Sequence, residues 1–169
     1  MTFDFTVTVP QDLSHQEPIL ISGADSLQLD GRAYLVVDDF GKRLFEIRYE
    51  YHCSPFKQAL ILDTVVAVGF EAHFYLFDFI TKSNLLSLEM DGYFGHLYLH
   101  NDKFYVADSA GLYCINKSGT TLWSNKGLAV DGVIIHDFDE NKIFGSGEWD
   151  PPGGWQDFIV DERSGTLIE

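Results

Sequence analysis

Short apolar runs alternate with polar turns along the chain, and the clearest example lies near its middle. Phe74-Tyr-Leu-Phe-Asp78 is an apolar run that ends in an acid, Lys82-Ser-Asn84 is a polar turn, and Leu85-Leu-Ser-Leu88 is a second apolar run. Runs of this length bounded by turn residues are typical of β-strands. The segment therefore predicts a β-hairpin over residues 74–88.

Three other segments repeat this form. They are Ala33-Tyr-Leu-Val-Val-Asp38 with Leu44-Phe-Glu-Ile47, Leu112-Tyr-Cys-Ile-Asn116 with Thr121-Leu-Trp123, and Asp157-Phe-Ile-Val-Asp161 with Thr166-Leu-Ile168. Their turns are Asp39-Phe-Gly-Lys42, Lys117-Ser-Gly-Thr120 and Arg163-Ser-Gly-Thr166. The residues that end the first strand of each hairpin are 40, 38 and 45 positions apart, a spacing typical of repeated β-sheet units; they are Asp38, Asp78, Asn116 and Asp161.

These four marker residues have a physical role at the strand ends. An Asp or Asn side chain accepts hydrogen bonds from backbone amides two residues on, and Gly or Asn supplies the positive φ that a tight turn needs. We therefore expect each marker to end a strand and open a turn.

Further short strands are expected upstream of each hairpin. They cover residues 19–21 and 26–29, 60–62 and 65–68, 97–99 and 104–106, and 133–135 and 143–144. Asp30-Gly31 and Asn101-Asp102 predict tight turns inside these units. Because no segment has a sustained 3.6-residue period, almost no helix is expected.

The sequence thus predicts an all-β fold of about four antiparallel repeats in one domain over residues 1–169. The repeats span approximately residues 19–58, 59–95, 96–132 and 133–169, and residues 1–18 precede them as an edge strand. Residues 3–9 alternate apolar and polar positions. We expect this edge strand to pair with the last repeat and close a ring, because an uncovered sheet edge invites aggregation.

The pattern resembles the β-propeller repeats of quinoprotein (PQQ-like or WD-like) type. In those repeats a strand ends in Asp, a Thr-Gly or Ser-Gly turn follows, and the next strand starts with an apolar residue and often Trp. Asn116-Lys-Ser-Gly119 before Leu122-Trp123 matches best, and Asp161-Glu-Arg-Ser-Gly165 before Leu167 is next. The resemblance covers residues 20–169. Such folds usually have six to eight blades. A chain with four repeats could therefore form a closed four-bladed ring, an open array, or a homodimer that completes a larger ring.

The charge of the chain disfavours some classes of binding partner. It has 26 acidic and 11 basic residues, a formal net charge of -15, and no cluster of Lys or Arg. Nucleic acid and anionic membranes would repel such a surface. The charge either maintains solubility or steers a basic protein onto an acidic face. No secretory signal or membrane-spanning run is visible in the sequence, so we expect a cytoplasmic protein.

No arrangement of residues in the sequence indicates catalysis, a metal or a cofactor. The two cysteines, Cys53 and Cys114, are not spaced as a zinc site and are expected to be buried reduced thiols. His96 and His100 would lie about 13 Å apart on one strand, too far for one metal. Ser146 in Gly145-Ser-Gly147 lacks the flanks and following helix of a nucleophile elbow. Asp137-Phe-Asp-Glu-Asn141 is read as a hairpin turn with solvated acids rather than a cation site.

The most unusual stretch is Gly147-Glu-Trp-Asp-Pro-Pro-Gly-Gly-Trp-Gln156, read as an inserted loop that lengthens the last repeat interval. Tryptophans beside acids are typical of interfaces with basic partners, although they could instead fold back and plug the sheet end. Asp91-Gly-Tyr-Phe-Gly95 and Asp131-Gly132 occupy equivalent positions between repeats. The predicted partner-binding residues are Glu148, Trp149, Asp150, Trp155, Asp91, Tyr93, Phe94, Asp131, Asp137 and Asp139.

Three functions remain open. The favoured one is a non-catalytic acidic module that binds a basic protein, such as an intracellular immunity or inhibitor protein that neutralises a toxin, for example a nuclease. The second is a quinoprotein-like propeller fragment that binds or converts a small molecule. The third is a structural module that assembles with copies of itself.

Overall fold

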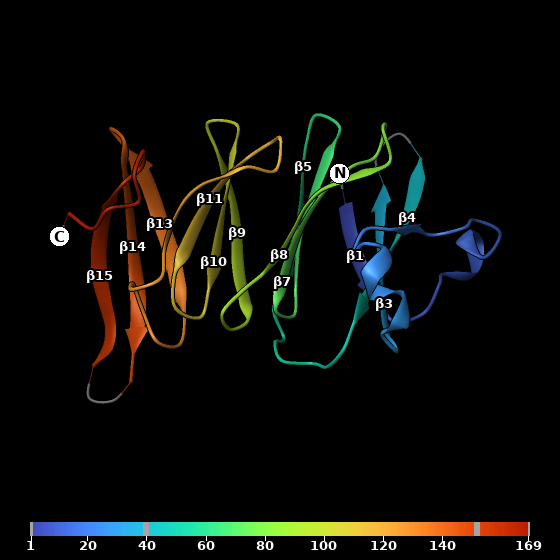
Figure 1. Cartoon of the computed structure of the whole chain (residues 1–169), viewed down its shortest axis with the longest axis horizontal. Helices are drawn as coiled ribbons and strands as arrows, with labels where there is room; N and C mark the ends of the chain where they lie inside the picture. The colour runs from blue at the N-terminus through green and yellow to red at the C-terminus, as the bar shows by residue number, and fades with distance from the viewer. Residues whose placement is uncertain (1, 39–40, 151–152, 169) are drawn as a thin grey trace. The chain divides into compact units, whose positions relative to one another are not determined.

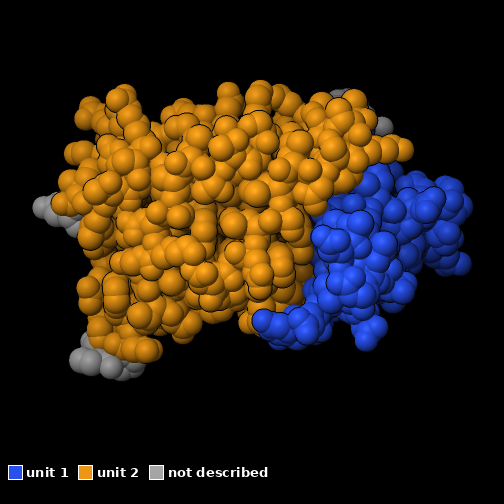
Figure 2. All heavy atoms as spheres, in the orientation of Figure 1, with its two compact units in different colours: residues 1–52 blue, residues 53–169 orange. Residues whose placement is uncertain are grey.

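The computed structural model describes residues 2–38, 41–150 and 153–168. Within these ranges the chain forms fifteen strands and two short 3-10 helices, in agreement with the predicted all-β class. The strands make four sheets of three or four strands, in which all pairs but one are antiparallel. The sheets are arranged as repeats and not as a closed barrel. The chain divides into two compact units, residues 1–52 and 53–169, which Figure 2 colours separately.

The first unit contains the first sheet, in the order β1-β3-β4-β2. Its strands are β1 (Thr2–Thr6), β2 (Ile19–Leu20), β3 (Gly31–Asp38) and β4 (Lys42–Tyr49). Strand β2 pairs in parallel with β4, and the other pairs are antiparallel.

The prediction that the N-terminal strand pairs with the last repeat was wrong. Strand β1 pairs with β3 of its own sheet, with Phe3 opposite Val37 and Phe5 opposite Leu35. The partly buried phenylalanines thereby share a face with buried apolar residues of β3, which fixes the register. Strand β1 therefore pairs with the nearby edge of β3, whose apolar positions match its own.

The strand expected over residues 26–29 is also absent from the first unit as described. The 3-10 helix η2 (Ala24–Gln28) lies there, and Gly31 begins β3 instead of forming a tight turn with Asp30. The Ser26 hydroxyl donates to the carbonyl of Gly23 at 2.7 Å and is 2.7 Å from the Ser22 hydroxyl. Such local side-chain bonds favour a turn over an extended strand.

The second unit contains three sheets, each an antiparallel meander in chain order (Figure 1). The second sheet has β5 (Lys57–Leu62), β6 (Val65–Phe70), β7 (His73–Asp78) and β8 (Ser83–Glu89). The third has β9 (Phe94–His100), β10 (Lys103–Asp108), β11 (Leu112–Asn116) and β12 (Thr121–Asn125). The fourth has β13 (Val133–Asp139), β14 (Lys142–Trp149) and β15 (Gly154–Asp161). The strand expected over residues 166–168 is reduced to a bridge between Val160 and Leu167.

The marker residues behave as predicted wherever their turns are described. The side-chain oxygens of Asp78, Asn116 and Asp161 each accept hydrogen bonds from backbone amides two to four residues on. The turn after Asp38 includes residues 39 and 40, which lie outside the described residues. In the second repeat the positive φ falls on Lys82, at 55°, and not on a Gly or Asn.

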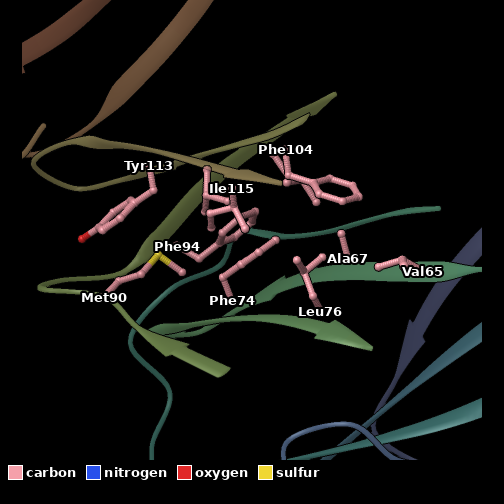
Figure 3. Packing of buried hydrophobic residues seen from close by; sticks show 11 residues of the cluster. Val65, Ala67, Phe74, Leu76, Met90, Phe94, Phe104, Tyr113 and Ile115 are labelled. Carbon is pink, nitrogen blue, oxygen red and sulfur yellow. The ribbon is translucent and has the colours of Figure 1, made fainter. Parts of the chain in front are cut away.

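The two central strands of the third sheet, β10 and β11, are buried on both faces within the second unit. Phe104 and Val106 of β10 pack in the core shared with the second sheet, whereas Tyr105 and Ala107 pack in the core shared with the fourth. Successive residues of a strand point to opposite faces, so one short run supplies both cores. Figure 3 shows the first of these cores. The rings of Phe74 and Phe104 in it lie 6.4 Å apart between centroids.

Side chains cover exposed edges of the first strands of these sheets. The Gln58 amide on β5 donates to the carbonyl of Leu97 at 2.8 Å and accepts from its backbone amide at 2.9 Å. The hydroxyl of Tyr98 on β9 accepts from the backbone amide of Ile135 on β13 at 3.0 Å. The three strands thus meet through side chains where no strand pairing exists.

Turn glycines fit against the sheet that precedes them in the second unit. A Cβ at Gly119 would lie 2.4 Å from the carbonyl oxygen of Leu85, and a Cβ at Gly165 would lie 2.3 Å from the ring of Trp123. Leu85 and Trp123 each lie seven positions after a marker residue. The Trp123 indole also donates to the carbonyl of Glu162 at 2.9 Å. The Ser-Gly turn and the tryptophan of the predicted repeat therefore join neighbouring sheets.

Replacing Gly165 by Ala should destabilise the protein more than replacing Gly154. Both glycines have positive φ, 70° and 62°, so each substitution costs about 1–2 kcal/mol in backbone strain. A Cβ at Gly154 meets nothing within 4 Å. The contact with Trp123 should add about 1–3 kcal/mol at Gly165. Urea unfolding of both variants measures the difference, and equal losses of unfolding free energy would contradict the proposed packing.

A buried ionic network links the third and fourth sheets. Glu162, only 5% exposed, accepts from the Tyr105 hydroxyl at 2.7 Å and from the Lys103 ammonium at 3.0 Å. Burial by itself raises the pKa of the Glu162 carboxyl, but the two hydrogen bonds and the charge of Lys103 outweigh it and lower the pKa. The ionised carboxylate is therefore the form that the folded protein stabilises.

The variant Glu162→Gln should be less stable than the parent by about 1–3 kcal/mol at neutral pH, because it loses charge-assisted hydrogen bonds. Since the folded pKa is lowered, this contribution is present above the ordinary value of 4.5 and is lost as pH falls through the folded pKa. The difference in unfolding free energy between the two proteins should therefore shrink below about pH 4.5. A difference that stays constant down to pH 3 would contradict this assignment.

Candidate functional site

A pocket of about 320 Å³ opens where the first strands of the three sheets in the second unit begin. Its walls come from the segment before β5, the start of β9, the loop before β13 and the end of the β14–β15 hairpin. We call it the aromatic-acidic pocket. It is lined by Phe56, Tyr93, Gly95, His96, Asp131, Gly132, Val133, Ile134, Glu148 and Trp155.

The buried Glu71 carboxylate holds the segment that carries Phe56. It accepts from the backbone amides of Cys53 at 2.6 Å and Ser54 at 3.0 Å. The Ser54 hydroxyl in turn donates to the carbonyl of Phe94 and accepts from the amide of Phe56. Phe56 is thereby fixed with its ring 6.1 Å from that of Tyr93 and 5.8 Å from that of His96, between centroids.

The opposite wall is built around Asp131. The Tyr93 hydroxyl donates to the Asp131 carbonyl at 2.6 Å and lies 3.0 Å from its carboxylate. The backbone amides of Val130 and Asp131 donate to the carbonyl of Glu148, and the amide of Glu148 donates to the carbonyl of Gly132. The loop before β13 is therefore tied to the adjacent hairpin.

The lining of the pocket carries two carboxyl groups, one histidine and no Lys or Arg. Burial is the main cause that raises the pKa of Tyr93 to about 12, helped by its hydrogen bond to Asp131 and by the charges of Asp131 and Glu148. Tyr93 therefore stays a hydrogen-bond donor at neutral pH. Burial also lowers the pKa of His96, which keeps this imidazole neutral. The pocket is therefore an aromatic hollow whose only formal charges are the negative charges of Asp131 and Glu148.

The segment over residues 147–156 is not the loop that the sequence predicted. Residues up to Trp149 belong to β14 and residues from Gly154 to β15, so the stretch is the end of a hairpin; Pro151 and Pro152 lie outside the described residues. Glu148 is paired with Trp155 and Trp149 with Gly154. Because neighbouring positions alternate between faces, the two tryptophans point to opposite sides.

Four of the ten predicted partner-binding residues lie in the pocket, and the other six lie outside it. The pocket brings together Tyr93, Asp131, Glu148 and Trp155. Trp149 is half-buried and lines a separate hollow of about 230 Å³ with Leu128 and Phe158, while Asp150 is exposed beyond it. Trp155 itself is 50% exposed, which argues against the alternative that it plugs the sheet.

The remaining predicted residues lie elsewhere. Phe94 is fully buried in the core with its ring against Gly69, so its assignment to a binding surface was wrong; an aromatic residue in a Gly-rich segment can equally start a core strand. Asp91 pairs with Lys126 at 2.5 Å. Asp137 and Asp139 are exposed within β13, and the turn itself consists of Glu140 and Asn141.

Sequence reasoning missed two of the aromatic groups of the pocket. Phe56 precedes β5 without an acidic neighbour, and a single histidine such as His96 indicates a structural or surface role more often than a site. A signal was present, because residues 54–57, 93–96 and 131–134 all lie just before or at the first strand of their repeat. Aligning the repeats on that position would have placed the three segments together.

Ser146 lies within β14, and its hydroxyl donates to the carboxylate of Asp157 at 2.7 Å and is 2.6 Å from Nε2 of His136. Since its single hydrogen points to Asp157, the oxygen accepts from Nε2–H of His136. A serine nucleophile requires the reverse order, in which the hydroxyl donates to the imidazole and the carboxylate orients the ring.

Ser146 should therefore not react with a fluorophosphonate, a reagent that labels activated serines. Mass spectrometry of the protein after incubation should show no adduct under conditions that fully label a known serine hydrolase. An adduct that is absent from the variant Ser146→Ala would show that the hydroxyl is activated and would contradict this reading.

The described residues offer neither a metal site nor an activated thiol. Within residues 2–38, 41–150 and 153–168, no three His, Cys, Asp or Glu side chains gather as a metal ion would require. Cys114 is buried as predicted, but Cys53 is exposed, because it lies in the connecting segment before β5. Partial burial of the sulfur and the nearby Glu71 carboxylate nevertheless raise the pKa of Cys53, which disfavours its reactive thiolate. No helix in the described ranges has the length and apolarity to span a membrane.

Neither a protein-family model nor a curated protein sequence matches this chain. The function is therefore argued from the residues of the pocket and the charge of the chain.

Proposed function

We propose that this chain is a non-catalytic acidic module that binds a basic protein. The aromatic-acidic pocket supports this most directly, because it combines exposed aromatic area with carboxylates and contains no Lys or Arg. Aromatic residues are enriched at the centres of protein interfaces, and carboxylates beside them pair with Arg or Lys. The formal net charge of -15 would steer a positively charged partner toward the protein.

The specific form of this proposal is a cytoplasmic immunity or inhibitor protein that neutralises a basic toxin such as a nuclease. An anionic surface competes with nucleic acid for the cationic substrate groove of such an enzyme. Acidity, small size and a pocket suited to a cationic group support this form, and a homodimer remains compatible with it.

A small-molecule binder of quinoprotein type is the second candidate. The pocket volume of about 320 Å³ favours it, because ligand pockets start at about 300 Å³. Its aromatic lining and few convergent polar groups are also typical of ligand sites.

The proposal predicts a basic partner with salt-dependent affinity. The protein should be immobilised and exposed to a lysate of its source organism, and the captured protein should then be purified and titrated. Its dissociation constant should rise at least tenfold between ionic strengths of about 0.03 M and about 0.3 M, because exposed charges are screened at the higher value.

A neutral or acidic partner, or an affinity that does not change with salt, would contradict the proposal. For the toxin form, the purified partner should be a nuclease whose cleavage of DNA stops at one equivalent of this protein. Undiminished cleavage in the complex would overturn that form alone.

A further inference from the structure

The aromatic-acidic pocket leaves large aromatic surfaces in solvent around an unpaired carboxyl group. Phe56 is 43% exposed and Trp155 50% exposed, although both line the same hollow. Among the described residues, the Glu148 side chain has no hydrogen bond or ion pair, whereas the surface acids Asp12, Asp63 and Asp91 each pair with a lysine. The pocket therefore presents apolar area beside two carboxyl groups, of which Asp131 is bonded only to the Tyr93 hydroxyl and Glu148 has no internal partner.

We propose that this pocket receives an arginine side chain from the basic partner, with its guanidinium stacked on the aromatic rings and paired with Asp131 and Glu148. This inference rests on the proposed function and names the group that the partner inserts. In this proposal Phe56, Trp155 and the two acids all bind the same guanidinium group.

The chemistry of guanidinium fits both kinds of wall. The group is planar, so it stacks on aromatic faces, and it presents five N–H donors that match carboxylates in pairs. It is also more weakly hydrated than the ammonium of lysine, so it loses less on entering a half-enclosed hollow. A neutral ligand would leave the carboxylate of Glu148 without a partner, which costs free energy when water is excluded.

The walls are fixed before binding. Glu71 and Ser54 hold Phe56, and the Tyr93 hydroxyl bonds to Asp131 hold the loop before β13. Trp155 lies over Gly132, whose Cβ position would be 3.5 Å from the indole ring. Because these contacts exist in the free protein, little conformational entropy is lost when a side chain enters.

The first test uses the acetylated and amidated tripeptide Gly-Arg-Gly and its citrulline analogue as probes. Citrulline keeps the planar shape and removes the charge. Titration of isotope-labelled protein at low ionic strength should shift the indole N–H signal of Trp155, identified by its loss in Trp155→Phe. We expect the Arg peptide to bind at least tenfold more tightly than the citrulline peptide. Equal binding of the two peptides, or no shift with either, would overturn the proposal.

Charge-removing variants locate the site. Asp131→Asn with Glu148→Gln should weaken binding of the Arg peptide at least tenfold, because two charge-assisted pairs are lost. The matched control, Asp102→Asn with Glu140→Gln, removes the same charges from exposed turns about 20 Å along β9 and β13. Its effect should stay within about twofold. Equal weakening by both pairs would mean that overall charge, and not the pocket, attracts the peptide.

The captured basic partner separates this inference from the proposed function. If the partner binds the pocket variant as tightly as the control variant, the pocket assignment fails while the proposed function stands. If the Arg peptide binds as expected but no basic partner exists, the pocket chemistry stands and the proposed function fails. Agreement of both measurements supports the two together.

Discussion

The burial of β10 and β11, the central strands of the third sheet, on both faces is the constraint on which the second unit depends. Each residue of β10 from Phe104 to Asp108 is buried, and alternate residues enter different cores. Such a strand has no solvent face, so it reads in the sequence as a continuous apolar run. Polar residues are then confined to its ends, where Asp108 accepts amide hydrogen bonds from Ala110 and Gly111. The apolar run of β10 that ends in Asp108 follows directly from this burial.

That regularity explains how much of the fold could be predicted. Hairpins and their marker residues are local, because an Asp78 or Asp161 side chain bonds amides within a few positions. Pairing of the N-terminal strand is not local, and the sequence offered several edges of similar pattern. The 3-10 helix η2 depends on hydroxyl bonds of Ser26 that compete closely with an extended chain. Propensity alone does not decide such a competition.

The candidate site was predicted only in part, for a related reason. Acids and tryptophans of residues 147–156 were recognised by composition, but their faces depend on strand register. Glu148 and Trp155 share one face because they are paired, and Trp149 leaves the pocket because it is one position further on. Phe94 differs from Tyr93 by the same single step, which places one ring in the core and the other at the surface. Neighbouring positions of similar composition can therefore have opposite roles, because a shift of one residue moves a side chain to the other face.

Gln58, which joins β5 to β9, affects whether another molecule of this protein can add a strand to the edge of β9. A side-chain amide carries the same donor and acceptor as a peptide unit, so Gln58 satisfies Leu97 as a further strand would. A strand from another molecule that approached this edge would find both groups occupied. The occupied groups of Leu97 thus disfavour the addition of a further strand at this edge.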